Sequence, residues 1–459
     1  MTVGYWRLPK AESEISSKPA CIMRGVCPVG SNGIQMKDTV FTMRSTPYKF
    51  GVGATEEIGD DVASLGLKRV LVVTDAGVNA TGLPARVTAL IRGKGIEVGV
   101  FQDVSVEPTD SSVQLAIEFA SSFAPDGYVA IGGGSVMDTA KIMNLYGTYP
   151  APFLTYVNAP IGEARPVPGP LKPIVCLPTT AGTSSENTAI AVVDMTELRV
   201  KTGISHHHLR ATLGILDPLN SLTVPPMVTA CSGADVLTHA IESYTALAFN
   251  EREKPASAAE RPPYQGANPI SDIWCEKAIK LVREFLPMAV KDGKDIEART
   301  QMMLATIYAG MGFANAGVHL PHAMGYPIAG NVRGFHPPDY PQKKPLVPHG
   351  MSTALGAPAS FRFTANARPE RHKQIAEWMG VNTRGSGADL AGQALREAFI
   401  GFMQSIGLPN GLQAVGYTSN DIPALTEGTL KQRRLLGLSP QPVTQKAVEK
   451  MIEESLVVW

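Results

Sequence analysis

The chain has 459 residues, of which 44% are hydrophobic and 18% are charged, and its 41 basic side chains balance 41 acidic ones. This composition excludes a globally disordered chain and predicts about two or three globular domains. The balanced charge provides no basic surface for nucleic acid or an acidic membrane, and no apolar run reaches the roughly 18 residues of a membrane-spanning helix. We expect a soluble protein that binds neither nucleic acid nor membranes.

Residues 1–40 are expected to form an N-terminal extension ahead of the folded domains. The opening MTVGYWRLPK lacks the apolar segment of a secretory signal, and Glu12 and Glu14 disagree with the acid-poor composition of a transit peptide. Five cysteines without a CxxC pair favour free thiols in a reducing compartment. These features predict a cytoplasmic protein, with the mitochondrial matrix as the alternative if the source is eukaryotic.

Residues 41–219 have the pattern of an α/β domain. Helix-period segments such as 111–124 alternate with short apolar runs that end in turn residues and predict buried strands. The predicted strands lie in RVLVVTDAG (69–77), DGYVAIGGG (126–134), PIVCLPTTAGTSSE (173–186) and LGILDP (213–218). Strands that alternate with helices predict a mostly parallel sheet with helices on both faces.

Residues 220–459 are expected to form a second, all-helical domain, with the boundary near 219–222. Strand signals nearly vanish here, and two stretches rich in proline and glycine, 254–270 and 330–350, predict functional loops. The long helix-period segments are 228–248, 271–290, 297–317 and 444–458.

A glycine triplet ends the second predicted strand and opens a helix in GGGSVMDTAK (132–141). Gly133 and Gly134 would let the backbone approach a phosphate, and the helix N-terminus would offer free N–H groups. Ser135 could add a hydroxyl, and Asp138 lies in the first helical turn. The pattern differs from GxGxxG, and a plain tight turn is an equal alternative.

Two further strand ends carry polar side chains that suit a nucleotide. Asp75 follows RVLVVT, where a carboxylate can bind ribose hydroxyls and repel a 2′-phosphate, which favours NAD over NADP. A helix N-cap is the alternative for this residue. Thr179, Thr180 and Thr183 form a hydroxyl-rich loop after the next strand, and a plain turn would account for that loop as well.

Four side chains in the second half are candidate metal ligands. Asp235 and His239 are four residues apart on one predicted helix and therefore share a face. His322 and His349 lie in apolar segments flanked by glycine and proline, where an imidazole without a partner is costly. A carboxylate with neutral imidazoles suits a divalent transition metal such as Fe²⁺ or Zn²⁺.

Other histidines are weaker candidates. The run of His206, His207 and His208 predicts a solvated loop. His319 lies three residues before His322 and is expected either to support a ligand or to face the substrate.

Taken together, the motifs GGGSxxDxAK, PTTAGTSSE, GADVLTHAIESY, HAMGYPIAG and VPHG resemble the iron-dependent (group III) alcohol dehydrogenases over about residues 40 to 457. Three stretches, 104–112, 261–274 and 312–330, are similar to the hydroxyacid-oxoacid transhydrogenase branch. That branch transfers a hydride from 4-hydroxybutyrate to 2-oxoglutarate, which yields succinic semialdehyde and D-2-hydroxyglutarate. The resemblance implies a Rossmann-like dinucleotide-binding domain over 41–219 and an all-α metal-binding domain over 220–459.

The resemblance also implies a ligand set. Asp235, His239, His322 and His349 would hold the metal, with Fe²⁺ expected and Zn²⁺ as the alternative. The cofactor would be NAD, and its implied contacts are Gly133, Gly134 and Ser135 at the pyrophosphate, Thr179, Thr180 and Lys201 at the nucleotide, and Asp75 at the ribose.

One position departs from the family pattern. Many alcohol-oxidising members carry a histidine four residues after the third ligand, where this chain has Tyr326, a poor base near neutral pH. A substrate carboxylate also needs a cation, for which Arg333 is our first candidate and His319 the second, with Lys343 and Lys344 on the same loop. The catalytic candidates are therefore His322, Tyr326, His319 and Arg333.

The expected function is a hydroxyacid-oxoacid transhydrogenase that acts on small hydroxy and oxo acids as a homo-oligomer, a dimer or larger. The first alternative is an NAD-dependent alcohol or 4-hydroxybutyrate dehydrogenase with a dissociable cofactor. A maleylacetate reductase, a metal-dependent lyase of the dehydroquinate synthase type and a non-enzymatic binding protein are more distant alternatives. Stoichiometric metal in the purified protein would exclude the last of these.

Overall fold

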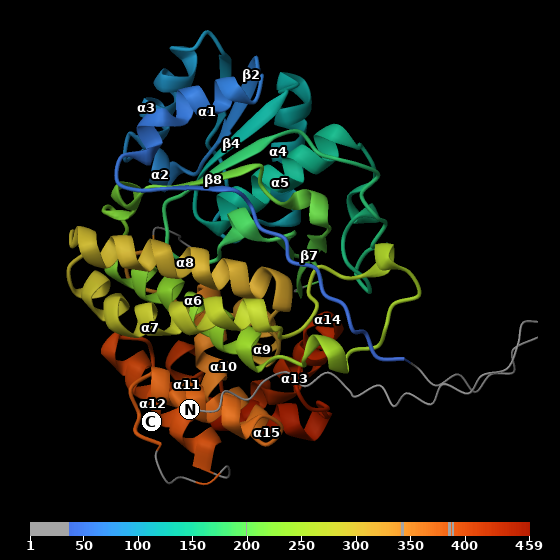
Figure 1. The fold of residues 1–459 in the computed structure, drawn as a ribbon, viewed down its shortest axis with the longest axis vertical. Coiled ribbons are helices and arrows are strands. Elements are labelled where there is room, and N and C mark those ends of the chain that lie inside the picture. The colour runs from blue at the N-terminus through green and yellow to red at the C-terminus, as the bar shows by residue number, and fades with distance from the viewer. Residues whose placement is uncertain (1–35, 199, 341–343, 384–386, 388–389) are drawn as a thin grey trace, which may run out of the picture.

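The computed structural model describes residues 36–459 apart from 199, 341–343, 384–386 and 388–389. The α/β part lies at the top of Figure 1, and the helical part lies below it. Most of the expected extension, residues 1–35, and the candidate Lys343 lie outside the described residues. Within the described part, no helix combines the length and apolar character needed to cross a membrane.

The α/β part is built on a six-stranded sheet in which every strand pair is parallel, in the order β1-β8-β5-β4-β2-β3. The four strands predicted from sequence form, and two further strands that were not predicted, β1 and β3, lie at the two edges of the sheet. Their bounds are β1 Tyr48–Phe50, β2 Arg69–Val73, β3 Glu97–Phe101, β4 Gly127–Gly132, β5 Ile174–Pro178 and β8 Leu213–Leu216.

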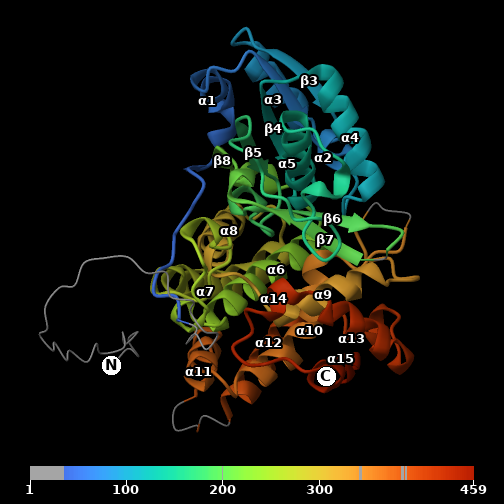
Figure 2. The ribbon, with the colours of Figure 1, turned by 90° about the vertical axis from the view of Figure 1, so that its right-hand side faces the viewer.

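Both faces of this sheet are covered by helices, as Figures 1 and 2 show. Side chains alternate along a strand, so Val70 and Val72 of β2 pack with α1 and α3, while Leu71 and Val73 pack with α4 and α5. This double burial accounts for the almost continuous apolar sequences of the strands. The bounds are α1 Ile58–Ser64, α2 Ala76–Asn79, α3 Leu83–Arg92, α4 Asp110–Phe123 and α5 Gly134–Thr148.

An antiparallel hairpin, not predicted from the sequence, follows β5. It consists of β6 (Ile190–Met195) and β7 (Val200–Ser205) and forms a separate two-stranded sheet. β7 contacts α9 of the helical part, so the hairpin spans the junction between the two parts.

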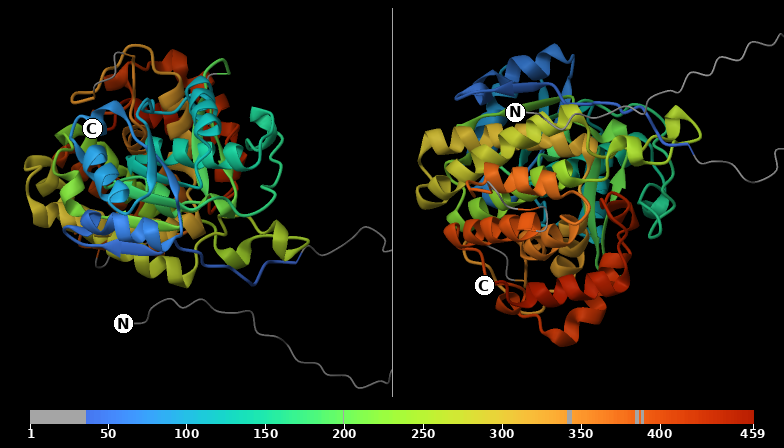
Figure 3. Two further views of the ribbon diagram at one scale, coloured as in Figure 1. Left: turned by 90° about the horizontal axis from the view of Figure 1, so that it is seen from above. Right: turned by 60° about the horizontal axis from the view of Figure 1, so that its bottom comes forward.

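The second half of the chain is helical, as expected, and its layers are seen from two further sides in Figure 3. α6 is the central helix: it is rich in small residues, is buried along most of its length and packs against α7, α8 and α10. The bounds are α6 Pro226–Thr245, α7 Pro269–Lys291, α8 Ile296–Ala316, α9 Leu320–Gly330, α10 His349–Thr364, α11 Pro369–Trp378, α12 Ala391–Ser405, α13 Ile422–Leu430, α14 Arg433–Leu436 and α15 Gln445–Leu456.

Polar residues at the helix starts fix several of these bounds. The Asn268 side chain accepts hydrogen bonds from the N–H groups of Ile270 and Ser271, and Asp295 accepts one from Ala298. Such caps satisfy N–H groups that have no partner within the helix.

We propose the domain boundary where the sequence predicted it, between the end of β8 and the start of α6. Residues 36–46 precede the sheet in the sequence but lie against the helical part (Figure 1). Arg261 pairs with Asp38, and the backbone N–H of Arg44 donates to Asn315 at 2.8 Å. This segment therefore links the two parts before the chain enters the sheet.

Candidate active site

The four candidate ligands converge from three helices. Asp235 and His239 lie on α6, His322 on α9, and His349 is the first residue of α10. His322 Nε2 is 3.0 Å from His239 Nε2 and 3.6 Å from Asp235 Oδ1, and His349 Nε2 is 3.8 Å from the same oxygen. The ligand atoms of Asp235, His322 and His349 all lie within 4.8 Å of one another, which suits a shared divalent metal, and His239 adjoins this group beside His322.

The charge states of this group also suit a cation. Burial raises the pKa of Asp235 to about 6, and burial followed by the charge of Arg434 lowers the pKa of His322 to about 3. Burial lowers the pKa of His239 well below its ordinary value, so the imidazoles are neutral, which is the form that binds metals. Asp235 Oδ2 is buried without a hydrogen-bond partner within the described part of the chain, which would be costly without a ligand.

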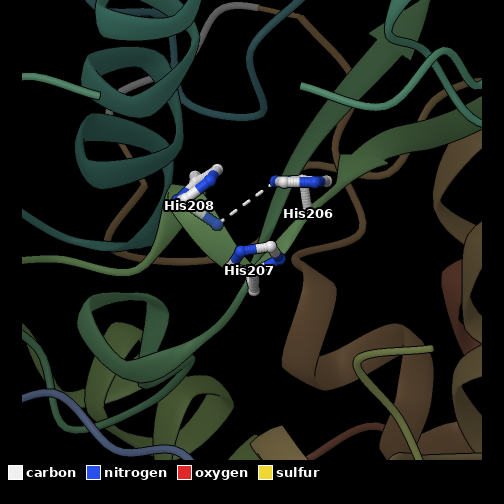
Figure 4. A group of neighbouring side chains, drawn as sticks. All are labelled: His206, His207 and His208. Carbon is white, nitrogen blue, oxygen red and sulfur yellow. Dashed lines mark hydrogen bonds between the residues drawn. The ribbon is translucent and has the colours of Figure 1, made fainter. Parts of the chain in front are cut away.

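A second histidine group is less suited to a cation. His206, His207 and His208 lie side by side (Figure 4), and one ring nitrogen from each lies within 4.8 Å of the others, but the group contains no carboxylate. The Nδ1 atom of His206 accepts a hydrogen bond from the backbone N–H of His208 at 3.3 Å. Burial, the two neighbouring imidazoles and the Arg44 guanidinium lower the pKa of His206 to about 4, and that guanidinium would repel a metal ion.

The glycine turn lies where β4 ends and α5 begins. Gly133 immediately precedes the helix and Gly134 is its first residue. A Cβ atom on Gly134 would lie 2.7 Å from the Thr183 side chain, and one on Gly133 would lie 3.3 Å from Thr180 Oγ1. Glycine therefore allows the loop after β5 to lie against the N-terminus of α5, which faces the cleft between the two parts of the molecule.

That cleft connects the nucleotide candidates with the metal candidates. One cavity of about 440 Å³ extends from Asp75 to Asp235 and His349. A neighbouring cavity of about 140 Å³ is lined by His239, His322 and Tyr326. The residues common to both cavities are Glu107, Gly134, Ser135, Thr183 and His349.

Asp75, Asp138 and Lys201 line the cleft but also have partners within the protein. Asp75 caps α2 by accepting a hydrogen bond from the N–H of Val78 at 2.9 Å, so the N-cap alternative is correct and leaves its other oxygen available. Asp138 accepts hydrogen bonds from Ser185 and from the backbone of Val192. Lys201 forms an ion pair with Glu107.

Three comparisons with known proteins bear on this arrangement. Residues 45–218 match the family described as iron-containing alcohol dehydrogenase, and residues 258–456 match the C-terminal domain of the Fe-containing alcohol dehydrogenase family. The chain belongs to the iron-containing alcohol dehydrogenase family. It is therefore an oxidoreductase, and the family resemblance seen in the sequence is confirmed.

Individual members of the family sharpen this assignment. The mitochondrial hydroxyacid-oxoacid transhydrogenase of Bos taurus is 44% identical over 439 residues, which are 95% of this chain and 93% of the relative. A solved 1,3-propanediol oxidoreductase has a TM-score of 0.79 at 29% identity, covering 91% of this chain and 100% of that protein. The sulfoacetaldehyde reductase of Bifidobacterium kashiwanohense, solved with NAD⁺, has a TM-score of 0.75 at 26% identity, covering 91% and 99%. The branch expected from the sequence is confirmed, as is the Rossmann-like parallel sheet followed by an all-α region.

Two catalytic candidates lie away from the cleft. The side chain of Arg333 is 71% exposed and pairs with Asp421, and Arg333 does not line either cavity. His319 is fully buried behind the ligands, where its Nε2 atom is 2.9 Å from Thr245 Oγ1. The geometry does not support a substrate contact for either residue, because α9 directs His319 inward and the ion pair holds Arg333 at the surface.

Tyr326 does line the cavity beside the ligands. Its ring centroid is 6.0 Å from that of His349, and burial raises the pKa of its hydroxyl. The hydroxyl is therefore protonated near neutral pH and can donate a hydrogen bond, but it is a poor base.

Glu242, which the sequence pattern did not single out, is fully buried on α6 one turn beyond His239. Its Oε1 atom accepts hydrogen bonds from the backbone N–H groups of His319 (2.8 Å) and His322 (3.3 Å), and its Oε2 atom is hydrogen-bonded to His322 Nδ1. A carboxylate that accepts from Nδ1–H leaves the Nε2 lone pair free for a metal. The signal in the sequence was a glutamate one helical turn past a histidine, in a helix whose only other carboxylate is that of Asp235.

The Glu242→Gln variant is expected to bind a divalent metal about 10–100-fold more weakly. Oε1 already accepts two backbone N–H groups, so the new amide NH₂ would face His322 Nδ1 and favour the tautomer with a proton on Nε2. Chelator competition measures the affinity, and Glu276→Gln on the exposed face of α7 is the control. Equal affinity in Glu242→Gln and wild type would show that Glu242 does not set the tautomer.

Proposed function

We propose that this protein transfers a hydride from 4-hydroxybutyrate to 2-oxoglutarate, producing succinic semialdehyde and D-2-hydroxyglutarate. The observation that carries the proposal is that the four candidate metal ligands open onto the cleft whose glycine turn suits a dinucleotide. The 44% identity to the bovine transhydrogenase over 95% of the chain supports this choice of reaction.

We propose Asp235, His239, His322 and His349 as the ligands of one divalent metal. A metal bound there would supply Lewis acidity, which lowers the pKa of a substrate hydroxyl or polarises an oxo group. The iron-containing descriptions of the matched families favour Fe²⁺, with Zn²⁺ as the alternative. Metal analysis of protein purified without oxygen distinguishes them, because an Fe²⁺ protein would contain about one iron and little zinc per chain.

We propose NAD as the cofactor that carries the hydride between the two substrates. The glycine turn and the helix N-terminus at Gly133, Gly134 and Ser135 suit a pyrophosphate, and Thr179, Thr180 and Thr183 line the same cavity. Asp75 at its far end disfavours a 2′-phosphate. The complex of the related sulfoacetaldehyde reductase with NAD⁺ supports this assignment.

The chain's own residues contribute in three ways. The helices around α6 bury the ligand group and limit the access of water to the reacting atoms. Tyr326 can hold a proton near the reacting oxygen and donate it when an oxo group becomes a hydroxyl. In the first half-reaction, C4 of 4-hydroxybutyrate loses a hydride and its hydroxyl loses a proton. In the second, C2 of 2-oxoglutarate gains a hydride and its oxygen gains a proton.

Incubating the purified protein with 4-hydroxybutyrate and 2-oxoglutarate, without added NAD, tests the reaction. Steady formation of D-2-hydroxyglutarate in equal amount to succinic semialdehyde is expected, because the cofactor would be reoxidised within the site. Turnover that requires added NAD and releases free NADH would instead identify an NAD-dependent dehydrogenase with a dissociable cofactor. Chiral analysis of the product is included, because formation of L-2-hydroxyglutarate would contradict the proposed D-isomer.

We further propose a mitochondrial location over the cytoplasmic one expected from the sequence, on the strength of the bovine relative's name. Imaging of the tagged protein in the source cells, with the tag at the C-terminus, tests this location. The homo-oligomeric state stays a prediction that light scattering can measure.

A further inference from the structure

The two proposed substrates share one chemical feature beyond the reacting carbon. In 4-hydroxybutyrate the carbon that bears the hydroxyl is separated from the carboxylate by two methylene groups. In 2-oxoglutarate the keto carbon is separated from the distal carboxylate by the same two groups. A single cation at a fixed distance from the ligand group could therefore hold both substrates in turn, an inference that rests on the proposed function.

Two cationic side chains line the cavity that contains His239, His322 and Tyr326, namely Lys201 and Arg434. Lys201 is buried and pairs with the carboxylate of Glu107, while Asp194 lies 4.0 Å away. Burial acts to lower the pKa of Lys201, but the charges of Glu107 and Asp194 and the hydrogen bond to Glu107 together raise it. The Lys201 charge is thus already balanced by the protein.

Arg434 is in a different situation. It lies on α14, and no carboxylate in the described part of the chain is within ion-pair distance of its guanidinium. The guanidinium carbon lies 5.0 Å from the ring centroid of Tyr264, a buried residue that lines the same cavity. Tyr264 orients the guanidinium through its ring face and a hydrogen bond without neutralising it, which leaves the remaining N–H groups available to an anion.

The position of Arg434 distinguishes it from the other basic residues nearby. Lys431 forms an ion pair with Glu427 at 2.8 Å. Arg433 lines an adjacent cavity, which Arg434 and Tyr326 also line, but it does not line the one with the metal candidates.

We propose that Arg434 binds the distal carboxylate common to 4-hydroxybutyrate and 2-oxoglutarate, and so selects acids for both half-reactions. Its planar N–H pair matches a carboxylate in bidentate fashion. Arg434 takes the role that the sequence analysis gave to Arg333.

The Arg434→Gln variant tests this assignment, with Arg433→Gln as the matched control on the same helix. In Arg434→Gln, KM for 4-hydroxybutyrate and KM for 2-oxoglutarate are both expected to rise by on the order of 30-fold, while kcat changes by less than about threefold. Arg434→Lys is expected to recover part of the loss, because it restores the charge but not the bidentate geometry. Arg433→Gln should leave both KM values unchanged.

A binding measurement separates recognition from catalysis. Butyrate carries the carboxylate but no reacting oxygen, so calorimetric titration of butyrate into the intact protein reports on the carboxylate site alone. Wild type is expected to bind butyrate at least about tenfold more tightly than Arg434→Gln does, and butyramide should not distinguish the two. Matching thermal unfolding curves would show that Arg434→Gln is folded.

Two outcomes overturn the proposal. Unchanged KM values and unchanged butyrate binding in Arg434→Gln would mean that another group holds the carboxylate. A rise in KM for 2-oxoglutarate alone would mean that Arg434 contacts the carboxylate next to the keto group, which 4-hydroxybutyrate lacks. Failure of the proposed function is distinct from both, because wild type itself would then fail to convert the substrate pair.

Discussion

The Asp235→Asn variant is expected to lose its divalent metal and to retain less than about 1% of the wild-type turnover. Asp235 supplies the one carboxylate among the four proposed ligands, and its Oδ1 atom faces both His322 and His349. Without that charge, three neutral imidazoles would have to balance a dication in a buried site. Metal content by mass spectrometry and the two-substrate assay measure the two losses.

Unfolding should not be the cause of this result. Burial raises the pKa of Asp235 to about 6, so the metal-free protein gains little from keeping this carboxylate charged. The metal-free variant should therefore unfold at the same temperature as metal-free wild type, or slightly higher. A control in which His206, His207 and His208 are all replaced by glutamine should keep full metal content. Stoichiometric metal in Asp235→Asn, or its loss from the triple variant, would contradict the ligand assignment.

The elements that could be predicted from the sequence are those in which local pattern and burial agree. The strands β2, β4, β5 and β8 are apolar on both faces, and a run of that kind bounded by turn residues is typical of a buried parallel strand. The helices α6, α7, α8 and α15 agree with their predicted segments to within a few residues. The metal candidates could be named because imidazoles in apolar segments require partners, although their convergence is visible only in the folded chain.

The elements that escaped prediction depend on contacts between distant residues. The β6–β7 hairpin was hidden because its strands, no shorter than the predicted ones, are stabilised by contacts with α5 and α9 around the cleft. Arg333 and Arg434 look alike in the sequence, but Arg333 pairs with Asp421, 88 positions away, and Arg434 faces the cavity. Nothing local distinguishes an arginine that is already paired from one that can bind a substrate.

The second prediction concerns Gly350, where α10 packs closely against α6. This glycine follows His349 at the start of α10, and a Cβ atom there would lie 2.0 Å from the Cys231 carbonyl oxygen and 2.9 Å from the Asp235 Cβ. The first of these atoms belongs to the backbone of α6 and cannot rotate away. Glycine at this position therefore lets the two helices lie close enough for His349 and Asp235 to share an ion.

The Gly350→Ala variant is expected to lose about 1–3 kcal/mol of unfolding free energy and to bind metal at least about 100-fold more weakly. The added methyl group forces α10 away from α6, which separates the ligands that the two helices carry. Denaturant unfolding of the metal-free protein measures the first effect, and chelator competition measures the second.

Gly401→Ala on α12 is the matched control, because a Cβ atom there meets no other atom within 4 Å. The same substitution in an open helical position should be neutral or stabilise the protein by about 0.5–1 kcal/mol, since alanine loses less conformational entropy than glycine on folding. If Gly350→Ala were destabilised but bound metal as tightly as wild type, helix separation would not control the site. If both alanine variants behaved alike, the contact between α10 and α6 would be looser than the geometry at Gly350 requires.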